Sequence, residues 1–163
     1  METQQISPVL PPAEAEIPPA VQAACADSHP FLHALGLQFV DSAKGSAVVR
    51  LPLVNAHMNS WGITHGGVLM SLLDVAMANA ARSLYGDERG VVTVEMKTTF
   101  LQPGGIAGNL LEARATVLQP TTTMCFCEAE IRDGERLIAK ASGSFKYLKI
   151  RQSASQLQRM CEN

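Results

Sequence analysis

The chain of 163 residues lacks several features that would assign it to common classes of protein. It has no excess of basic charge, since 13 lysine and arginine residues stand against 15 acids and the formal net charge is −2. Non-specific binding to nucleic acid needs a basic field, so nucleic acid is not an expected partner. The sequence also contains no apolar run of about 18 residues or more, and we therefore expect no membrane-spanning helix.

Cysteine is scarce, and the four cysteines are not spaced as a metal site or a disulfide framework. Cys125 and Cys127 would share one face of a strand, where a small buried apolar side chain is the simplest role. Free thiols fit a reducing, cytoplasmic location. His29 and His33 have the spacing of metal ligands but no third ligand nearby, so we interpret them as surface histidines and expect no metal site.

The two ends of the sequence differ in composition from its middle. Residues 1–28 are rich in proline and alanine and contain no lysine or arginine, which predicts a flexible leader and not a signal peptide. One domain is expected over residues 29–150, because a chain of this length is too short for two ordinary domains. Residues 151–163 are polar and are expected to form a frayed tail.

The hydrophobic pattern between the two ends predicts an α+β domain. The expected helices and strands are a short helix over 29–35 ended by Gly36, a hairpin of strands 37–41 and 46–53, a long apolar helix over 65–84, and strands over 90–100, 108–118, 123–131 and 137–148. Without alternating βαβ units, the strands should form one antiparallel sheet with the long helix against its inner face. On the polar face, Glu112, Glu128 and Glu130 are expected to pair with lysines of the last strand.

The start of the long helix carries the strongest chemical signal. Freed backbone amides at Gly66 and Gly67 would favour a carbonyl oxygen that is gaining negative charge. Asp74 is an acid on an otherwise apolar helix, and a buried carboxylate is costly unless it is paired or used. It lies about 12 Å further along the helix axis, so one small group cannot touch both features of the same helix. If they act together, Asp74 should come from another subunit.

Together, Asn59, the turn of His65, Gly66 and Gly67, Asp74 on the helix, strand 93–96 and the bend at 103–104 resemble the hotdog-fold acyl-CoA thioesterases of the phenylacetate-degradation type. The resemblance runs from about residue 36 to residue 148. It implies a sheet wrapped around a central helix, two protomers joined through one continuous sheet, and commonly a tetramer made of two such dimers.

The resemblance also implies roles for individual residues. Gly66 would donate its N–H to the thioester oxygen, with Asn59 helping to hold that end of the site. Asp74 of the partner protomer would act as general base or nucleophile, and Thr93 would help to hold the water. Segments 100–105 and 118–123 would contact coenzyme A. The candidate substrate-binding residues are His65, Gly67, Phe100, Gln102, Pro103, Gly104, Gln119, Thr121 and Thr123. The second segment departs from its relatives, because it lacks the glycine and basic residues often found there, and the anchor for the phosphates is left open.

The sequence thus predicts an acyl-CoA thioesterase that hydrolyses an aryl- or medium-chain acyl-CoA to the free acid and coenzyme A, with no cofactor beyond the substrate. No G-x-S-x-G elbow is present, which argues against a serine-hydrolase mechanism. A hotdog-fold hydratase or dehydratase and a non-catalytic acyl-CoA-binding protein are the alternatives. Structural roles are also open: Asp74 as a paired acid, His65 as a helix-positioning residue, Asn59 as a turn residue and Thr93 as a strand former.

Overall fold

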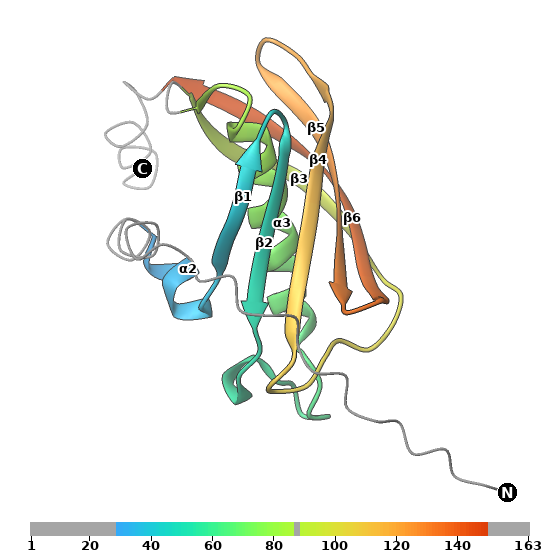
Figure 1. Ribbon diagram of the computed structural model, residues 1–163. Coiled ribbons are helices and arrows are strands. Elements are labelled where there is room, and N and C mark those ends of the chain that lie inside the picture. The colour runs from blue at the N-terminus through green and yellow to red at the C-terminus, as the bar shows by residue number, and fades with distance from the viewer. Residues whose placement is uncertain (1–28, 87–88, 150–163) are drawn as a thin grey trace, which may run out of the picture.

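A computed structural model describes residues 29–86 and 89–149, so the predicted leader and tail lie outside the described residues. Six strands form one sheet that curves around helix α3, with the short helix α2 beside the start of β1 (Figure 1). The elements in chain order are α2 (Pro30–Leu35), β1 (Gln38–Ala43), β2 (Ser46–Pro52), the 3-10 turn η1 (Asn55–His57), α3 (Gly66–Arg82), β3 (Arg89–Phe100), β4 (Leu110–Pro120), β5 (Met124–Asp133) and β6 (Arg136–Lys149).

The sheet has the order β1-β2-β4-β5-β6-β3, and every neighbouring pair is antiparallel. The predicted turn between β1 and β2 is present: Lys44 and Gly45 both have positive φ, 49° and 82°, as a two-residue type I′ hairpin turn requires. Gly36 ends α2 in the left-handed conformation, as its position in the sequence predicts. None of the helices in the described part of the chain is long and apolar enough to cross a bilayer.

Helix α3 packs into the curve of the sheet through one apolar stripe. The fully buried members of this stripe are Leu72, Leu73, Ala76, Met77, Ala80 and Ala81. Small residues of the facing strands let the helix approach closely, and Cys125 and Cys127 are among them as free, buried thiols 3.8 Å apart. The expectation that these cysteines serve as small core residues is confirmed.

The helix ends two residues earlier than the sequence pattern suggests. Arg82 is its last residue, and Ser83 follows as the cap. The Ser83 hydroxyl accepts a hydrogen bond from the Gly45 N–H at 2.8 Å and donates one to the carbonyl oxygen of Ala80, also at 2.8 Å. The side chain therefore ties the end of α3 to the β1–β2 turn, a long-range contact that local periodicity does not reveal.

Strand β3 lies at the edge of the sheet and contains a β-bulge that the sequence pattern did not show. Thr93 pairs with Phe145 and Glu95 with Ser144, so Val94 is an extra residue in β3. The sequence over 90–100 predicts a strand of unbroken alternation, in which Thr93 and Met96 would lie on opposite faces, and this prediction is wrong. The bulge brings both of these side chains to the helix side of the strand, where each of them faces α3.

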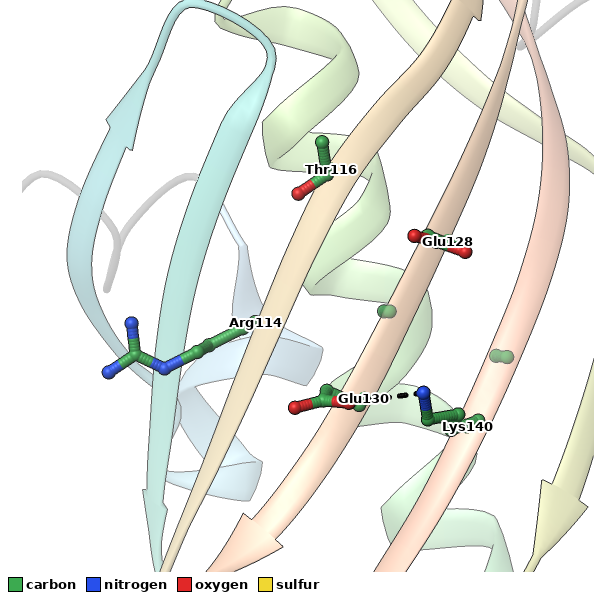
Figure 2. Close-up of a pocket in the computed structure, with 7 residues that line it drawn as sticks. Arg114, Thr116, Glu128, Glu130 and Lys140 are labelled. Carbon is green, nitrogen blue, oxygen red and sulfur yellow. Dashed lines mark ion pairs between the residues drawn. The ribbon is translucent and has the colours of Figure 1, made fainter. Parts of the chain in front are cut away.

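The outer face of the sheet is polar, as expected. Figure 2 shows Arg114, Glu128, Glu130 and Lys140 around a shallow depression on strands β4 to β6, with α3 behind the strands. The predicted cross-strand ion pair between Glu130 and Lys140 is present, with a distance of 3.3 Å between the carboxylate oxygen and the ammonium nitrogen. Glu130 also accepts a hydrogen bond from Arg132 Nε at 2.8 Å.

The other two acids of this face do not pair with lysines. Glu112 accepts a hydrogen bond from Arg50 Nε at 2.8 Å and contacts Arg114, because β4 has β2 and not β6 as its neighbour. Partial burial alone would raise the pKa of Glu112, but the hydrogen bonds and charges of the two arginines lower it below its usual value. Glu128 faces Thr116 and Ser142 across the sheet and makes no ion pair within residues 29–86 and 89–149.

Glu130→Gln is expected to make the free energy of unfolding depend less on pH at acid pH. The hydrogen bond from Arg132 and the charge of Lys140 lower the pKa of Glu130 in the folded state. The carboxylate therefore contributes stability above the unfolded pKa of about 4.3, and this contribution is lost as pH falls through the lower folded pKa. Because the pair is largely solvated, the difference should be under about 1 kcal/mol. Urea unfolding at a series of pH values measures it, and Glu128→Gln is the matched control. An equal change in both variants would contradict the assignment.

Candidate functional site

His65 directly precedes helix α3 and determines which backbone amides remain free at its start. Its Nδ1 accepts a hydrogen bond from the Gly67 N–H at 2.9 Å, so His65 is the N-cap of the helix. This shows the helix-positioning role of His65. It also corrects one expectation, because the Gly67 amide is already paired and is not a free donor. The Gly66 N–H donates to no partner within the described residues.

Gly66 opens onto a groove of about 360 Å³, which we call the Gly66 groove. It is lined by Asn59, Ile63, Thr64, Gly66, Leu69, Phe100, Leu101, Gln102, Pro103 and Gly104. The structure therefore brings together five residues that the resemblance connected to one site: Asn59, Phe100, Gln102, Pro103 and Gly104. The Phe100 ring lies over Gly66, since a Cβ on this glycine would be 3.4 Å from the ring.

Two neighbouring contacts fix the walls of this groove. Asn59 Oδ1 accepts hydrogen bonds from the N–H groups of Trp61 at 2.8 Å and Ile63 at 3.4 Å, so the side chain closes the loop before α3. The buried Thr64 hydroxyl donates to the carbonyl oxygen of Gly105 at 2.6 Å, which holds the segment after β3 against the start of the helix. Asn59 therefore has the turn role observed here, while its amide nitrogen makes no hydrogen bond to the described residues.

Asp74 lies in a second depression, in the middle of α3. The Thr93 hydroxyl donates a hydrogen bond to Asp74 Oδ1 at 2.7 Å, so the structure brings these two predicted residues into contact. The apolar composition of the helix suggests a carboxylate desolvated among Leu72, Leu73, Val75 and Met77, but Asp74 is only half-buried in the single chain. These four side chains are buried, whereas Asp74 lies at the edge of the buried stripe, where Thr93 of β3 reaches it.

This second depression, the Asp74 pocket, has a volume of about 240 Å³. Its walls are Phe31 and Leu32 of α2, Met70, Ser71, Asp74 and Val75 of α3, and Met96 of β3. Asp74 is the one residue among these that the sequence identified as a candidate site residue. Helical spacing alone could have found Met70, which precedes Asp74 by one turn. No local signal connects α2 to Asp74, because they meet only when the sheet curves around α3.

The two depressions are separate on one chain, and the predicted residues of segment 118–123 lie far from the Gly66 groove. Gln119, Thr121 and Thr123 are at the end of β4 and the start of β5, close to the β1–β2 turn that contacts the C-terminal end of α3. The seventeen residues of α3 span about 25 Å. A single protomer therefore does not bring this segment together with Gly66.

Comparisons with known proteins assign the family. Residues 62–140 match the model of the Thioesterase superfamily. The Pseudomonas aeruginosa protein PA0474, provisionally named an esterase, is 36% identical over 121 residues, which cover 72% of this chain and 88% of that protein. The acyl-coenzyme A thioesterase PaaI of Escherichia coli is 37% identical over 86 residues, covering 52% of this chain and 57% of that protein. The chain belongs to the thioesterase superfamily.

Solved structures agree with this assignment. The structure of the E. coli PaaI protein from the phenylacetic acid degradation operon superposes with a TM-score of 0.70 at 28% identity, covering 77% of this chain and 89% of that one. The sheet around α3 is thus the hotdog fold, as the sequence predicts. The chain is an enzyme of the thioester-hydrolase class and a homologue of PaaI.

Proposed function

We propose that this enzyme hydrolyses an aryl- or medium-chain acyl-CoA thioester to the free acid and coenzyme A, at a site formed by two protomers. The observation that carries the proposal is the Gly66 N–H, which has no partner among the described residues and lines an open groove at the positive end of a helix. A thioester carbonyl oxygen in this groove would accept a hydrogen bond that strengthens as negative charge develops on it.

Each half of the site would come from a different protomer. Gly66 and Asp74 are about 12 Å apart along one helix, too far to act on the same carbonyl group. Strand β3 is a twelve-residue edge strand that carries exposed apolar side chains, including that of Val94, which is 55% exposed. A long edge strand presents unpaired backbone N–H and C=O groups that can pair with a second chain. Two copies paired through β3 would continue the sheet and could place Asp74 of one copy near the Gly66 groove of the other, giving a dimer at least and a tetramer if two dimers associate.

The proposed reaction uses groups that this chain supplies. Asp74, held by the Thr93 hydroxyl, takes a proton from a water, and the oxygen of that water bonds to the carbonyl carbon. The negative charge moves to the carbonyl oxygen at Gly66. When the carbonyl re-forms, the carbon–sulfur bond breaks and the thiolate leaves, taking up a proton to give free coenzyme A. Direct attack by Asp74, followed by hydrolysis of the resulting anhydride, would use the same geometry.

Neither route requires a metal or another cofactor. The free Cys125 and Cys127 thiols support a cytoplasmic location, where thiols are kept reduced.

A thiol-release assay with a panel of acyl-CoA esters tests this function. We expect stoichiometric release of coenzyme A and free acid from at least one aryl or medium-chain substrate. Hydration of crotonyl-CoA without thiol release would contradict the proposal in favour of a hydratase. Tight binding of acyl-CoA with no turnover of any ester would contradict it in favour of a binding protein. Sedimentation under assay conditions should show a dimer or tetramer, and a fully active monomer would exclude a shared site.

A further inference from the structure

The walls of the Asp74 pocket come from three separate elements and are mostly apolar. Helix α2 supplies Phe31, α3 supplies Met70 and Val75, and β3 supplies Met96, so that the Asp74 carboxylate opens into an apolar surrounding. The volume of about 240 Å³ is smaller than the roughly 300–1,000 Å³ of typical sites for drug-sized ligands. A compact apolar group would fit here better than a long chain.

Helix α2 is placed beside this pocket without contributing a buried side chain to the core. It has six residues, and a helix of this length is not stable alone in water. Phe31 has the largest side chain in the pocket wall, yet it is 61% exposed and its ring is available to a ligand. Packing in the core therefore does not explain why an aromatic side chain is exposed at this position. A role in the neighbouring Asp74 pocket would explain it.

We propose that the Asp74 pocket receives the acyl group of the substrate and that Phe31 of α2 is its specificity-determining contact, selecting compact apolar acyl groups. This inference rests on the proposed function, because it takes Asp74 to be near the reacting carbonyl. The flexible thioether side chains of Met70 and Met96 adapt to the shape of a small apolar group, and they make favourable contacts with rings. A ring or a short branched chain beside Phe31 would exclude water from the neighbourhood of Asp74.

Phe31→Ala tests the inference through both turnover and binding. Loss of a ring contact of about 1 kcal/mol or slightly more should lower kcat/KM for ring or branched acyl-CoA by about 5- to 10-fold, with acetyl-CoA changed by less than about twofold. Binding of the non-hydrolysable thioethers S-benzyl-CoA, S-methyl-CoA and S-dodecyl-CoA is measured by calorimetry in parallel. The Phe31→Ala variant should bind S-benzyl-CoA more weakly than the parent enzyme does and should bind the other two thioethers equally well. Phe126→Ala is the matched control, because Phe126 is 45% exposed on the outer face of β5, away from the pocket.

Each result separates this inference from the proposed function. Hydrolysis that is equally fast in Phe31→Ala and the parent enzyme for every acyl group would overturn the role of Phe31 and leave the thioesterase function standing. Absence of hydrolysis with loss of S-benzyl-CoA affinity in the variant would overturn the thioesterase function and support the pocket. Equal affinity of both proteins for all three thioethers, or a change of oligomer size in Phe31→Ala in place of a change in selectivity, would overturn the inference.

Discussion

Asp74→Asn is expected to lower kcat on acyl-CoA by about 10²-fold or more, the effect of losing a general base. Asparagine has nearly the same shape as aspartate, and its carbonyl oxygen can still accept the hydrogen bond that Thr93 Oγ1 donates at 2.7 Å. It cannot take up the proton of the attacking water or act as a carboxylate nucleophile. Because Asp74 is half-buried and outside the core, the fold should be unaffected. Steady-state thiol release and thermal unfolding measure the two effects.

Ser71→Ala provides a control in the same pocket. Ser71 lies close to Asp74 on α3, and its hydroxyl donates a hydrogen bond to the Gly67 carbonyl oxygen at 3.0 Å. It has no carboxylate to lose, so turnover should stay within a few-fold of the parent enzyme. Unchanged kcat in Asp74→Asn, or an equal loss in both variants, would remove Asp74 from the mechanism.

Gly104→Ala is expected to cause the second large effect. A Cβ at this position would lie 2.7 Å from the Thr64 Cβ, closer than such atoms approach in proteins. Thr64 cannot move easily, because it is buried and its hydroxyl is bonded to Gly105. The segment after β3 should therefore shift away from α3, widening the groove at Gly66. A displacement of about 1 Å can cost about 10²-fold in activity, and we also expect a loss of about 1–3 kcal/mol of stability from overpacking.

Gly90→Ala is the matched control for this substitution. The nearest atoms to a Cβ on Gly90 are 3.8 Å away, both in Leu148, and the residue has no positive φ. The same change of one methyl group should therefore leave the unfolding free energy within about 0.5 kcal/mol of the parent and leave kcat/KM unaltered. Chemical denaturation and the thiol-release assay provide both values. Equal behaviour of the two variants would show that the contact with Thr64 is unimportant.

Mixing these two impaired proteins tests whether the site is shared. In a heterodimer of Asp74→Asn and Gly104→Ala, one site would contain both defects and the other would contain neither. After subunit exchange, half of the dimers are mixed, so about a quarter of the parent activity should return. If Asp74 and the Gly66 groove of the same protomer act together, every site keeps one defect and no activity returns.

Much of the fold follows from periodicity and turn residues. Alternating side chains identified strands β4 to β6 within about two residues at most of their boundaries, and the Lys44–Gly45 turn defined the first hairpin. The apolar composition of residues 65–84 predicted a helix packed against the sheet. These features are local, so a single sequence records them. The end of α3 was misjudged because the Ser83 contact joins segments that are distant in the sequence.

The candidate site was predictable only in part. Gly66, Asn59 and Asp74 carry a recognisable spacing, and the structure adds the free N–H of Gly66 and the bond from Thr93 to Asp74. The exposure of Asp74 could not be read from the apolar composition of its helix, because it depends on which side of α3 the sheet covers. Phe31 escaped notice for the same reason, since its place in the pocket depends on the curvature of the sheet.

The extra residue Val94 makes the site depend on the length of β3 and not only on its composition. In an extended strand, residues an odd number apart point in opposite directions. Thr93 and Met96 are three apart, yet both reach α3, because the insertion reverses the parity between them. Deleting one residue here would leave nearly the same amino acids in the chain but would turn the hydroxyl away from the carboxylate while the methionine stayed in place. A gap at this point in a related sequence would therefore indicate a different arrangement around the acid, even where both side chains are retained.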